Sequence, residues 1–309
     1  MSNEVFFRFA WKLAPKVPNS LLMGIADIAS GIVWALNGRG VRQMRLNYRH
    51  LLGKAPREKD VRSGVRSYFR CFAQQFALPG WSPETLKCAA VYTRAKEAQK
   101  IIESGPLILA LTHSGNWDLA GAWFCQECAP IVTVAEKLEP EALFQDFVKF
   151  RESLGMTILG VGPGEHIFGR LLEATDGKQA LVPLLADRDI SGRGIEVQLG
   201  SSKALVAAGP AALALRLGRP LIAGHMYFEK VGGRQQLQID FTDPIPVPKV
   251  AEGESAVEAL TKAWVRAIEP RILERFTDWH MMQRLFVADL DADRLARAKS
   301  RVAEESEDK

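Results

Sequence analysis

The residues with the clearest chemical potential in this sequence are a histidine and an aspartate five positions apart. His113 and Asp118 follow closely on the apolar stretch Leu107–Leu111. A histidine held by a carboxylate can serve as a general base that takes a proton from a hydroxyl group. Positions five apart on a regular helix point about 140° apart, so an unbroken helix would not pair these side chains. They could pair if His113 lies in a turn before a helix and Asp118 lies in its first turn.

The elements around His113 are predicted from the apolar pattern. Five apolar residues, Leu107–Leu111, bounded by turn-forming residues are typical of a buried parallel strand. Ser114, Gly115 and Asn116 favour a turn and a helix cap, and the apolar pattern that follows is that of a helix. His113 would then lie at the carboxyl end of a strand, where open α/β sheets bind ligands. A lone histidine in a turn is often only a capping residue, and this placement is what favours a catalytic role.

Strands and helices alternate from about residue 91 onward, which predicts an α/β fold with a largely parallel central sheet and helices on both faces. Right-handed crossover connections place the ends of successive strands on one edge. His113, Glu136 and Asp187 each follow or end a predicted strand, so we expect them to gather on that edge. The further predicted strands are 131–135, 156–159, 180–185, 220–228 and 235–241, and the predicted helices of this part include 119–128, 140–154, 209–217 and 254–276.

The first 80 residues form a predicted helical region that associates with membranes. Residues 1–36 combine aromatic and basic side chains with an apolar segment, Leu21–Leu36, which Asp27 interrupts. That segment falls short of the roughly 20 apolar residues that a membrane span needs, so we expect an interfacial helix. A helix that simply packs on the core is the alternative. A basic stripe on the next helix suits anionic headgroups or a solvated face, and it comprises Arg39, Arg42, Arg45 and Arg49.

The composition is that of a globular protein, with 47% hydrophobic and 25% charged residues and a net charge of +4. The mildly basic balance suits an anionic surface, and no nucleic-acid-binding motif is present, so nucleic acid is not an expected partner. The CxxC motif Cys125–Cys128 lies in a predicted helix without a second ligand pair, so no metal site is predicted. We predict three regions, namely a helical region at 1–80, an α/β core at 81–290 and a charged tail at 291–309.

Several common catalytic patterns are absent from the sequence. It has no GxSxG nucleophile elbow, no Walker phosphate loop and no HExxH zinc motif. Ser114 directly follows His113, which is poor geometry for a serine nucleophile served by that histidine. A histidine base with acidic partners and no nucleophile fits direct attack of a bound hydroxyl on an activated acyl group. The base would take the hydroxyl proton as the new bond forms.

At these residues the sequence resembles a known enzyme family. His113–Asp118 matches the HxxxxD signature of glycerolipid-type and lipid A-type acyltransferases, and the longer pattern is more similar still to phosphatidylinositol mannoside acyltransferases. The similarity covers about residues 35–295. Five further segments resemble that family in order and spacing: Ala135–Leu138, Phe150–Gly155, Ala186–Ile190, Ala208–Ala211 and Asp278–Gln283.

The resemblance implies transfer of a fatty acyl group, palmitoyl, from acyl-CoA to the 6-hydroxyl of a mannose on phosphatidylinositol mannoside. Acyl-CoA would be a co-substrate, and no cofactor is implied. The enzyme would be peripheral, on the cytoplasmic face of the inner (plasma) membrane. By position, His113 would be the base, Asp118 the motif acid and Asp187 the carboxylate that polarises the histidine. The residues that would line the polar acceptor site are Glu136, Arg151 and Arg188.

Two departures from the family leave details open. Aspartate stands at position 187 where the family has glutamate, so either Asp118 or Asp187 could orient His113. The segment Gly194–Gly200 lacks the paired aromatic residues usual there, which bears on acyl-chain length and acceptor detail. Delivery of the acyl group by CoA or by a carrier protein is also open. The alternative functions are an acyltransferase with a lipid A-like glycolipid acceptor, an acyl-CoA hydrolase and a non-catalytic lipid-binding protein.

Overall fold

The computed structural model describes residues 9–137, 139–162, 167–190 and 192–290; the predicted charged tail lies outside these ranges. Within them, the centre is a seven-stranded sheet with the order β1-β9-β8-β2-β5-β3-β4. Every paired strand in it is parallel to its neighbour except β8 and β9, so the predicted largely parallel α/β fold is confirmed. The strands of this sheet are β1 Ala90–Val91, β2 Leu107–Leu111, β3 Ile131–Glu136, β4 Met156–Val161, β5 Leu181–Leu185, β8 Leu221–Val231 and β9 Arg234–Phe241.

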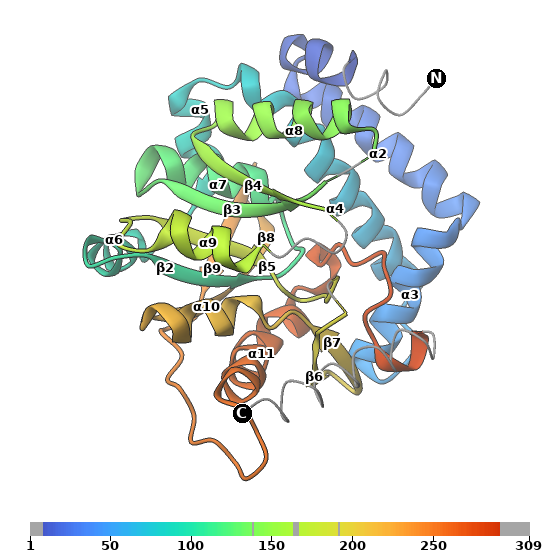
Figure 1. Ribbon diagram of the computed structural model, residues 1–309. Helices are drawn as coiled ribbons and strands as arrows, with labels where there is room; N and C mark the ends of the chain where they lie inside the picture. The colour runs from blue at the N-terminus through green and yellow to red at the C-terminus, as the bar shows by residue number, and fades with distance from the viewer. Residues whose placement is uncertain (1–8, 138, 163–166, 191, 291–309) are drawn as a thin grey trace.

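Helices cover both faces of the sheet (Figure 1), because the central strands are apolar on both sides. Ile108 and Val182 point to the face that α9, α10 and α11 cover. Leu109 and Leu181 point to the opposite face, against α6, α7 and α8. The helices that follow the first 80 residues are α5 Pro83–Ala89, α6 Ala95–Glu103, α7 Trp117–Glu127, α8 Glu141–Ser153, α9 Phe168–Thr175, α10 Gly209–Leu217 and α11 Ala256–Glu274.

Three N-terminal helices form a layer against one side of this core (Figure 1). Tyr48 and Val61 belong to the same hydrophobic cluster as Trp264 of α11, so the layer is packed into the core. The outermost helix of the layer, α2, rests on α4. The helices are α2 Asn19–Leu36, α3 Arg39–Leu52 and α4 Glu58–Ala77. The short 3₁₀ helices within the described ranges are η1 Ala14–Lys16, η2 Leu78–Gly80, η3 Phe276–Asp278 and η4 Val287–Asp289.

A separate antiparallel hairpin, β6 Ile195–Leu199 and β7 Ser202–Val206, lies between the core and α3. The sequence-based prediction lacks this hairpin. Ile195, Val197 and Leu199 do alternate with polar residues, but each strand has only five residues and the second one, Ser202–Val206, shows no alternation. Gly200 has a positive φ of 59°, and a Cβ there would meet the backbone of Leu51 at 2.1 Å. Glycine is therefore required for the tight turn and for the close approach of the hairpin to α3.

Candidate active site

The register of β2 and β5 brings His113 and Asp187 together. Leu111 of β2 is paired with Leu185 of β5 in a parallel ladder. His113 and Asp187 each lie two residues beyond that pair, so both leave the carboxyl edge of the sheet side by side. Although they are separated by 74 positions in the chain, the sheet makes them neighbours. This edge is the one where open α/β sheets bind ligands.

Three hydrogen bonds fix the Asp187 carboxylate. The His113 ring Nδ1 lies 2.5 Å from Oδ1, and the His113 backbone N–H donates to Oδ2 at 2.9 Å. The indole Nε1–H of Trp279 also donates to Oδ2, at 2.7 Å. The His113 side chain is 27% exposed, and Nε2 has no hydrogen-bond partner among the residues that the structure describes. The ring is therefore held on one side and open on the other, as a general base requires.

The electrostatics of the pair keep Asp187 ionised near neutral pH. Burial by itself raises the pKa of Asp187, but the charge of His113 and the hydrogen bonds from His113 and Trp279 outweigh burial, and the net pKa is lowered. A negative carboxylate at Nδ1 keeps the ring proton there and leaves Nε2 to accept a proton. It also stabilises the imidazolium that forms once Nε2 has taken that proton.

The other described histidines are unsuited to this role. Burial lowers the pKa of His225 to about 4 and that of His280 to about 3, so both rings stay neutral inside the protein. His50 is paired with Asp289 at 3.3 Å, but its second ring nitrogen bonds the hydroxyl of Ser202 at 2.9 Å. Both nitrogens of His50 are thus engaged, whereas His113 keeps one available.

Asp118 contacts a different partner. It is the second residue of α7, after the N-cap Asn116, whose side chain accepts from the Leu119 N–H at 3.0 Å. The Asp118 carboxylate accepts from Arg151 Nε of α8 at 2.7 Å and from the side-chain amide of Gln75 of α4. Asp118 is buried, so this ion pair ties three helices together beneath the catalytic turn. The structure therefore answers the open question of the sequence: Asp187, and not Asp118, is bonded to His113.

The residues predicted to line an acceptor site are placed differently from one another. Glu136 ends β3 at the same edge of the sheet as His113, and it is exposed. Arg188 directly follows Asp187 and is half-buried. The guanidinium of Arg151 points toward Asp118 and is already paired with it, so a ligand that reached Arg151 would contact an ion pair and not a free cation. Their binding roles stay predictions.

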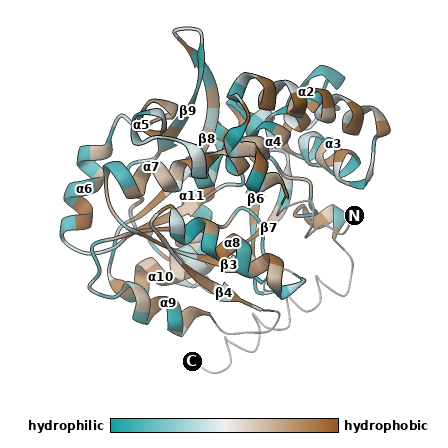
Figure 2. Cartoon of the chain, turned by 90° about the horizontal axis from the view of Figure 1, so that it is seen from above, coloured by the Kyte–Doolittle hydropathy of each residue, from teal (hydrophilic) through white to brown (hydrophobic). Residues whose placement is uncertain are grey.

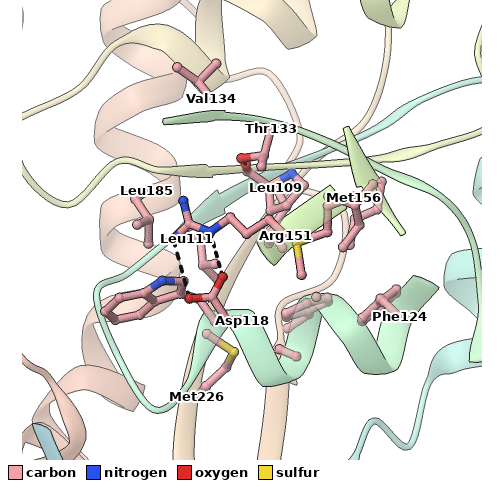
Figure 3. A pocket seen from close by; sticks show the side chains of 17 residues that line it. Leu109, Leu111, Asp118, Phe124, Thr133, Val134, Arg151, Met156, Leu185 and Met226 are labelled. Carbon is pink, nitrogen blue, oxygen red and sulfur yellow. Dashed lines mark hydrogen bonds and ion pairs between the residues drawn. The ribbon is translucent and has the colours of Figure 1, made fainter. Parts of the chain in front are cut away.

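An apolar pocket with a cavity volume of about 60 Å³ lies between the sheet and helices α7 and α8. Leu111, Trp117 and Leu185 line the end near His113 and Asp187, and the ring centroids of Trp117 and His113 are 6.0 Å apart. The Asp118–Arg151 pair lies in the pocket wall, as Figure 3 shows. Residues deeper along the strands complete an apolar lining: Phe124, Ile131, Met156, Leu181 and Phe241. A concave, mostly apolar lining with a few polar groups is typical of sites that bind small molecules.

Two residues of the site were missed by the sequence-based prediction. Trp279 bonds Asp187, and Gln75 bonds Asp118, across 92 and 43 positions respectively. No spacing signal links such distant residues, and only the resemblance of Asp278–Gln283 to the family singled out the neighbourhood of Trp279. Across the described ranges, no group of three or more His, Cys, Asp or Glu side chains could hold a metal ion.

The fold and the site suit an acyltransferase, and comparison with known proteins shows that the chain belongs to this class of enzyme. The model of the bacterial lipid A biosynthesis acyltransferase family matches residues 5–287, and the chain belongs to that family. The chain is 31% identical to the phosphatidylinositol mannoside acyltransferase of Mycolicibacterium smegmatis over 299 residues, 96% of this chain and 95% of that protein. It is 32% identical to the enzyme of the same name from Mycobacterium tuberculosis over 268 residues, 85% of this chain and 82% of that protein. The predicted acyltransferase identity is confirmed.

Proposed function

We propose that the protein transfers a palmitoyl group from acyl-CoA to the 6-hydroxyl of a mannose of phosphatidylinositol mannoside, with His113 as the general base. The observation that carries the proposal is the His113–Asp187 pair, with Nε2 open, beside an apolar pocket. The acceptor follows from the names of the relatives, which act on phosphatidylinositol mannoside by name. Two observations thus support the proposal: the geometry of the site suits acyl transfer, and similarity to the named relatives favours phosphatidylinositol mannoside as the acceptor.

In the proposed step, Nε2 of His113 takes the proton of the mannose hydroxyl while the oxygen attacks the thioester carbonyl carbon. A carbon–oxygen bond forms, and the carbon–sulfur bond then breaks. The departing thiolate receives the proton from the imidazolium, so the products are an ester and free CoA. Asp187 stabilises the positive ring between the two proton transfers. A general base of this kind contributes roughly 10²- to 10⁴-fold to the rate.

The apolar pocket has the chemical character that the acyl chain of the donor requires, but its cavity of about 60 Å³ would have to widen to admit a whole palmitoyl chain. Its lining is mostly hydrocarbon, and the Asp118–Arg151 charges in its wall are directed at each other. An acyl chain inserted there would leave water, which stabilises binding by roughly 0.8 kcal/mol for each buried methylene. Its carbonyl end would lie toward Trp117 and Leu185, on the side of His113. Glu136 and Arg188 remain the proposed contacts of the acceptor sugar.

We propose that α2 attaches the enzyme peripherally to the cytoplasmic face of the membrane. Exposed apolar side chains form one stripe along it, and Figure 2 shows hydrophobic stretches on this outer helix. Asp27, on the opposite side, bonds Arg66 and Arg70 of α4, which fixes the rotation of the helix. By length and composition α2 could cross a membrane, but these bonds support a helix lying in the interface. The stripe consists of Leu21, Ile25, Ile28, Ile32 and Leu36.

Replacing Ile28 of α2 by aspartate tests this attachment. Ile28 is 69% exposed in the middle of the stripe, so the change should leave the fold intact. We expect vesicle binding to fall at least tenfold, because burying one such side chain is worth about 1.5–3 kcal/mol and a charge opposes burial. Sedimentation with anionic vesicles measures it. Val247→Asp is the matched control, since Val247 is 56% exposed. It belongs to the segment that joins β9 to α11, which Figure 1 draws on the other side of the molecule from α2. Equal binding by both variants would exclude α2 as the membrane contact.

Product analysis tests the proposed reaction itself. The full-length protein is incubated with one defined phosphatidylinositol mannoside in vesicles and an equimolar mixture of acyl-CoAs of different length. We expect mass spectrometry to find acceptor carrying one added acyl group, palmitoyl above the others, on a mannose fragment. Free fatty acid formed without any dependence on acceptor would identify a hydrolase. Acylation of a lipid A-like disaccharide, with none of the mannoside, would identify a different glycolipid acceptor.

A further inference from the structure

A short C-terminal segment, residues 278–283, lies directly against the turn that carries His113, and we call it the C-terminal strap. Trp279 and Ser114 form an antiparallel bridge. The His280 N–H donates to the His113 carbonyl at 2.7 Å, and the Gly115 N–H donates to the Asp278 carbonyl at 2.9 Å. The strap therefore sets the backbone position of His113 through two main-chain hydrogen bonds.

The Trp279 side chain of the strap acts on the other member of the pair. Its indole N–H donates to Oδ2 of Asp187 at 2.7 Å, and both side chains are almost completely buried. Among the described residues, the remaining hydrogen bonds of the Asp187 carboxylate come from His113, through its ring and its own backbone N–H. Trp279 is therefore the one described residue outside position 113 that fixes where the carboxylate lies.

The N-terminal helices hold the strap in place. The side-chain amide of Asn47 on α3 donates to the carbonyls of Met281 and Gln283, both at 2.9 Å. The hydroxyl of Tyr48 donates to the Trp279 carbonyl at 3.3 Å, and Ser67 of α4 bonds the Asp278 carboxylate at 2.5 Å. Because three helix side chains bond the strap, the backbone of Trp279 is fixed, and its indole is held within reach of Asp187.

We propose that Trp279 is a positioning residue, whose indole N–H holds the Asp187 carboxylate in the orientation that keeps the proton of His113 on Nδ1 and leaves Nε2 facing the substrate. The proposal rests on the proposed role of His113 as the base. Hydrogen bonding from Trp279 also helps Asp187 to stay ionised although burial opposes its charge. The indole thus supports both the place and the charge of the carboxylate.

The test compares Trp279→Phe with Trp264→Phe. Both tryptophans are buried, but the indole nitrogen of Trp264 has no hydrogen-bond partner in the described part of the chain, so only the first variant loses a bond. For Trp279→Phe we expect kcat to fall roughly 10- to 100-fold with KM for both substrates unchanged, as for loss of a hydrogen bond to a charged group. Trp264→Phe should keep kcat within about twofold, whatever it does to the melting temperature.

A second measurement does not depend on turnover. The Nδ1 proton of His113, shared with Asp187 at 2.5 Å, should give a far-downfield proton resonance that His113→Ala removes. We expect that resonance to shift or broaden in Trp279→Phe and to stay unchanged in Trp264→Phe. If the phenylalanine variant fails to fold, benzothienylalanine at position 279 keeps the ring shape and replaces the N–H by sulfur. Unchanged kcat and an unchanged resonance in a folded variant would overturn the role of Trp279. If the wild-type enzyme shows no acyl transfer, the proposed function is refuted instead. The His113 resonance would then still test whether Trp279 positions Asp187.

Discussion

Replacing Asp187 by asparagine is expected to lower kcat roughly 10²- to 10⁴-fold while the protein stays folded. The amide has almost the shape of the carboxylate, and its oxygen can still accept from Trp279 and from the His113 backbone. Its NH₂ group would face Nδ1 of His113, however, and would favour the tautomer that carries the proton on Nε2. The neutral amide would also leave the imidazolium without a counter-charge. Steady-state transfer of labelled palmitoyl to the mannoside acceptor measures the change.

The same substitution at Asp118 is the matched control, since it is the other aspartate of the candidate pair. Asp118 bonds Arg151 and Gln75, so Asp118→Asn would leave the half-buried Arg151 without its counter-charge. Breaking a buried ion pair costs about 3–5 kcal/mol, so we expect the main effect in the free energy of unfolding, measured by denaturant titration. The kcat of the folded fraction should fall much less than in Asp187→Asn. A folded Asp118→Asn enzyme as slow as Asp187→Asn would contradict this division of roles.

The convergence of His113 and Asp187 was predictable from the sequence, but their contact was not. Polar residues after two buried strands suffice to place both at one edge of a parallel sheet. For the two side chains to touch, β2 and β5 must also be neighbours in the sheet, with Leu111 opposite Leu185. The apolar patterns of the strands specify neither the strand order nor this register. Glu136 illustrates the limit, because β3 ends at the same edge, yet the structure joins Glu136 to His113 by no described hydrogen bond.

The role of Asp118 shows a second limit of sequence reasoning. A position in the first turn of α7 was predicted, and the structure confirms it. The direction of the side chain depends on what packs around that turn, and here α4 and α8 supply Gln75 and Arg151. Those partners are 43 and 33 positions away, so no local spacing indicates them. The same holds for Trp279, whose bond to Asp187 exists only because α3 and α4 hold the strap.

Replacing His113 by alanine is expected to have the largest effect on activity, a loss of roughly 10³- to 10⁴-fold in kcat. Without the imidazole, no described group at the strand ends is bonded to Asp187 and open to a hydroxyl on its other side. Binding of acyl-CoA should persist, because the apolar pocket is unchanged. His50→Ala is the matched control, since His50 also pairs with a carboxylate but uses both ring nitrogens. That variant should keep kcat within about twofold.

The most direct measurement is a single-turnover assay with wild-type, His113→Ala and His50→Ala enzymes, each at saturating palmitoyl-CoA and mannoside acceptor. Circular dichroism and melting temperature establish first that all three proteins are folded. We expect the wild type and His50→Ala to form palmitoylated acceptor at similar rates. His113→Ala should form it at roughly one thousandth of that rate or below. Transfer by folded His113→Ala at the wild-type rate would contradict the assignment of His113 as the base.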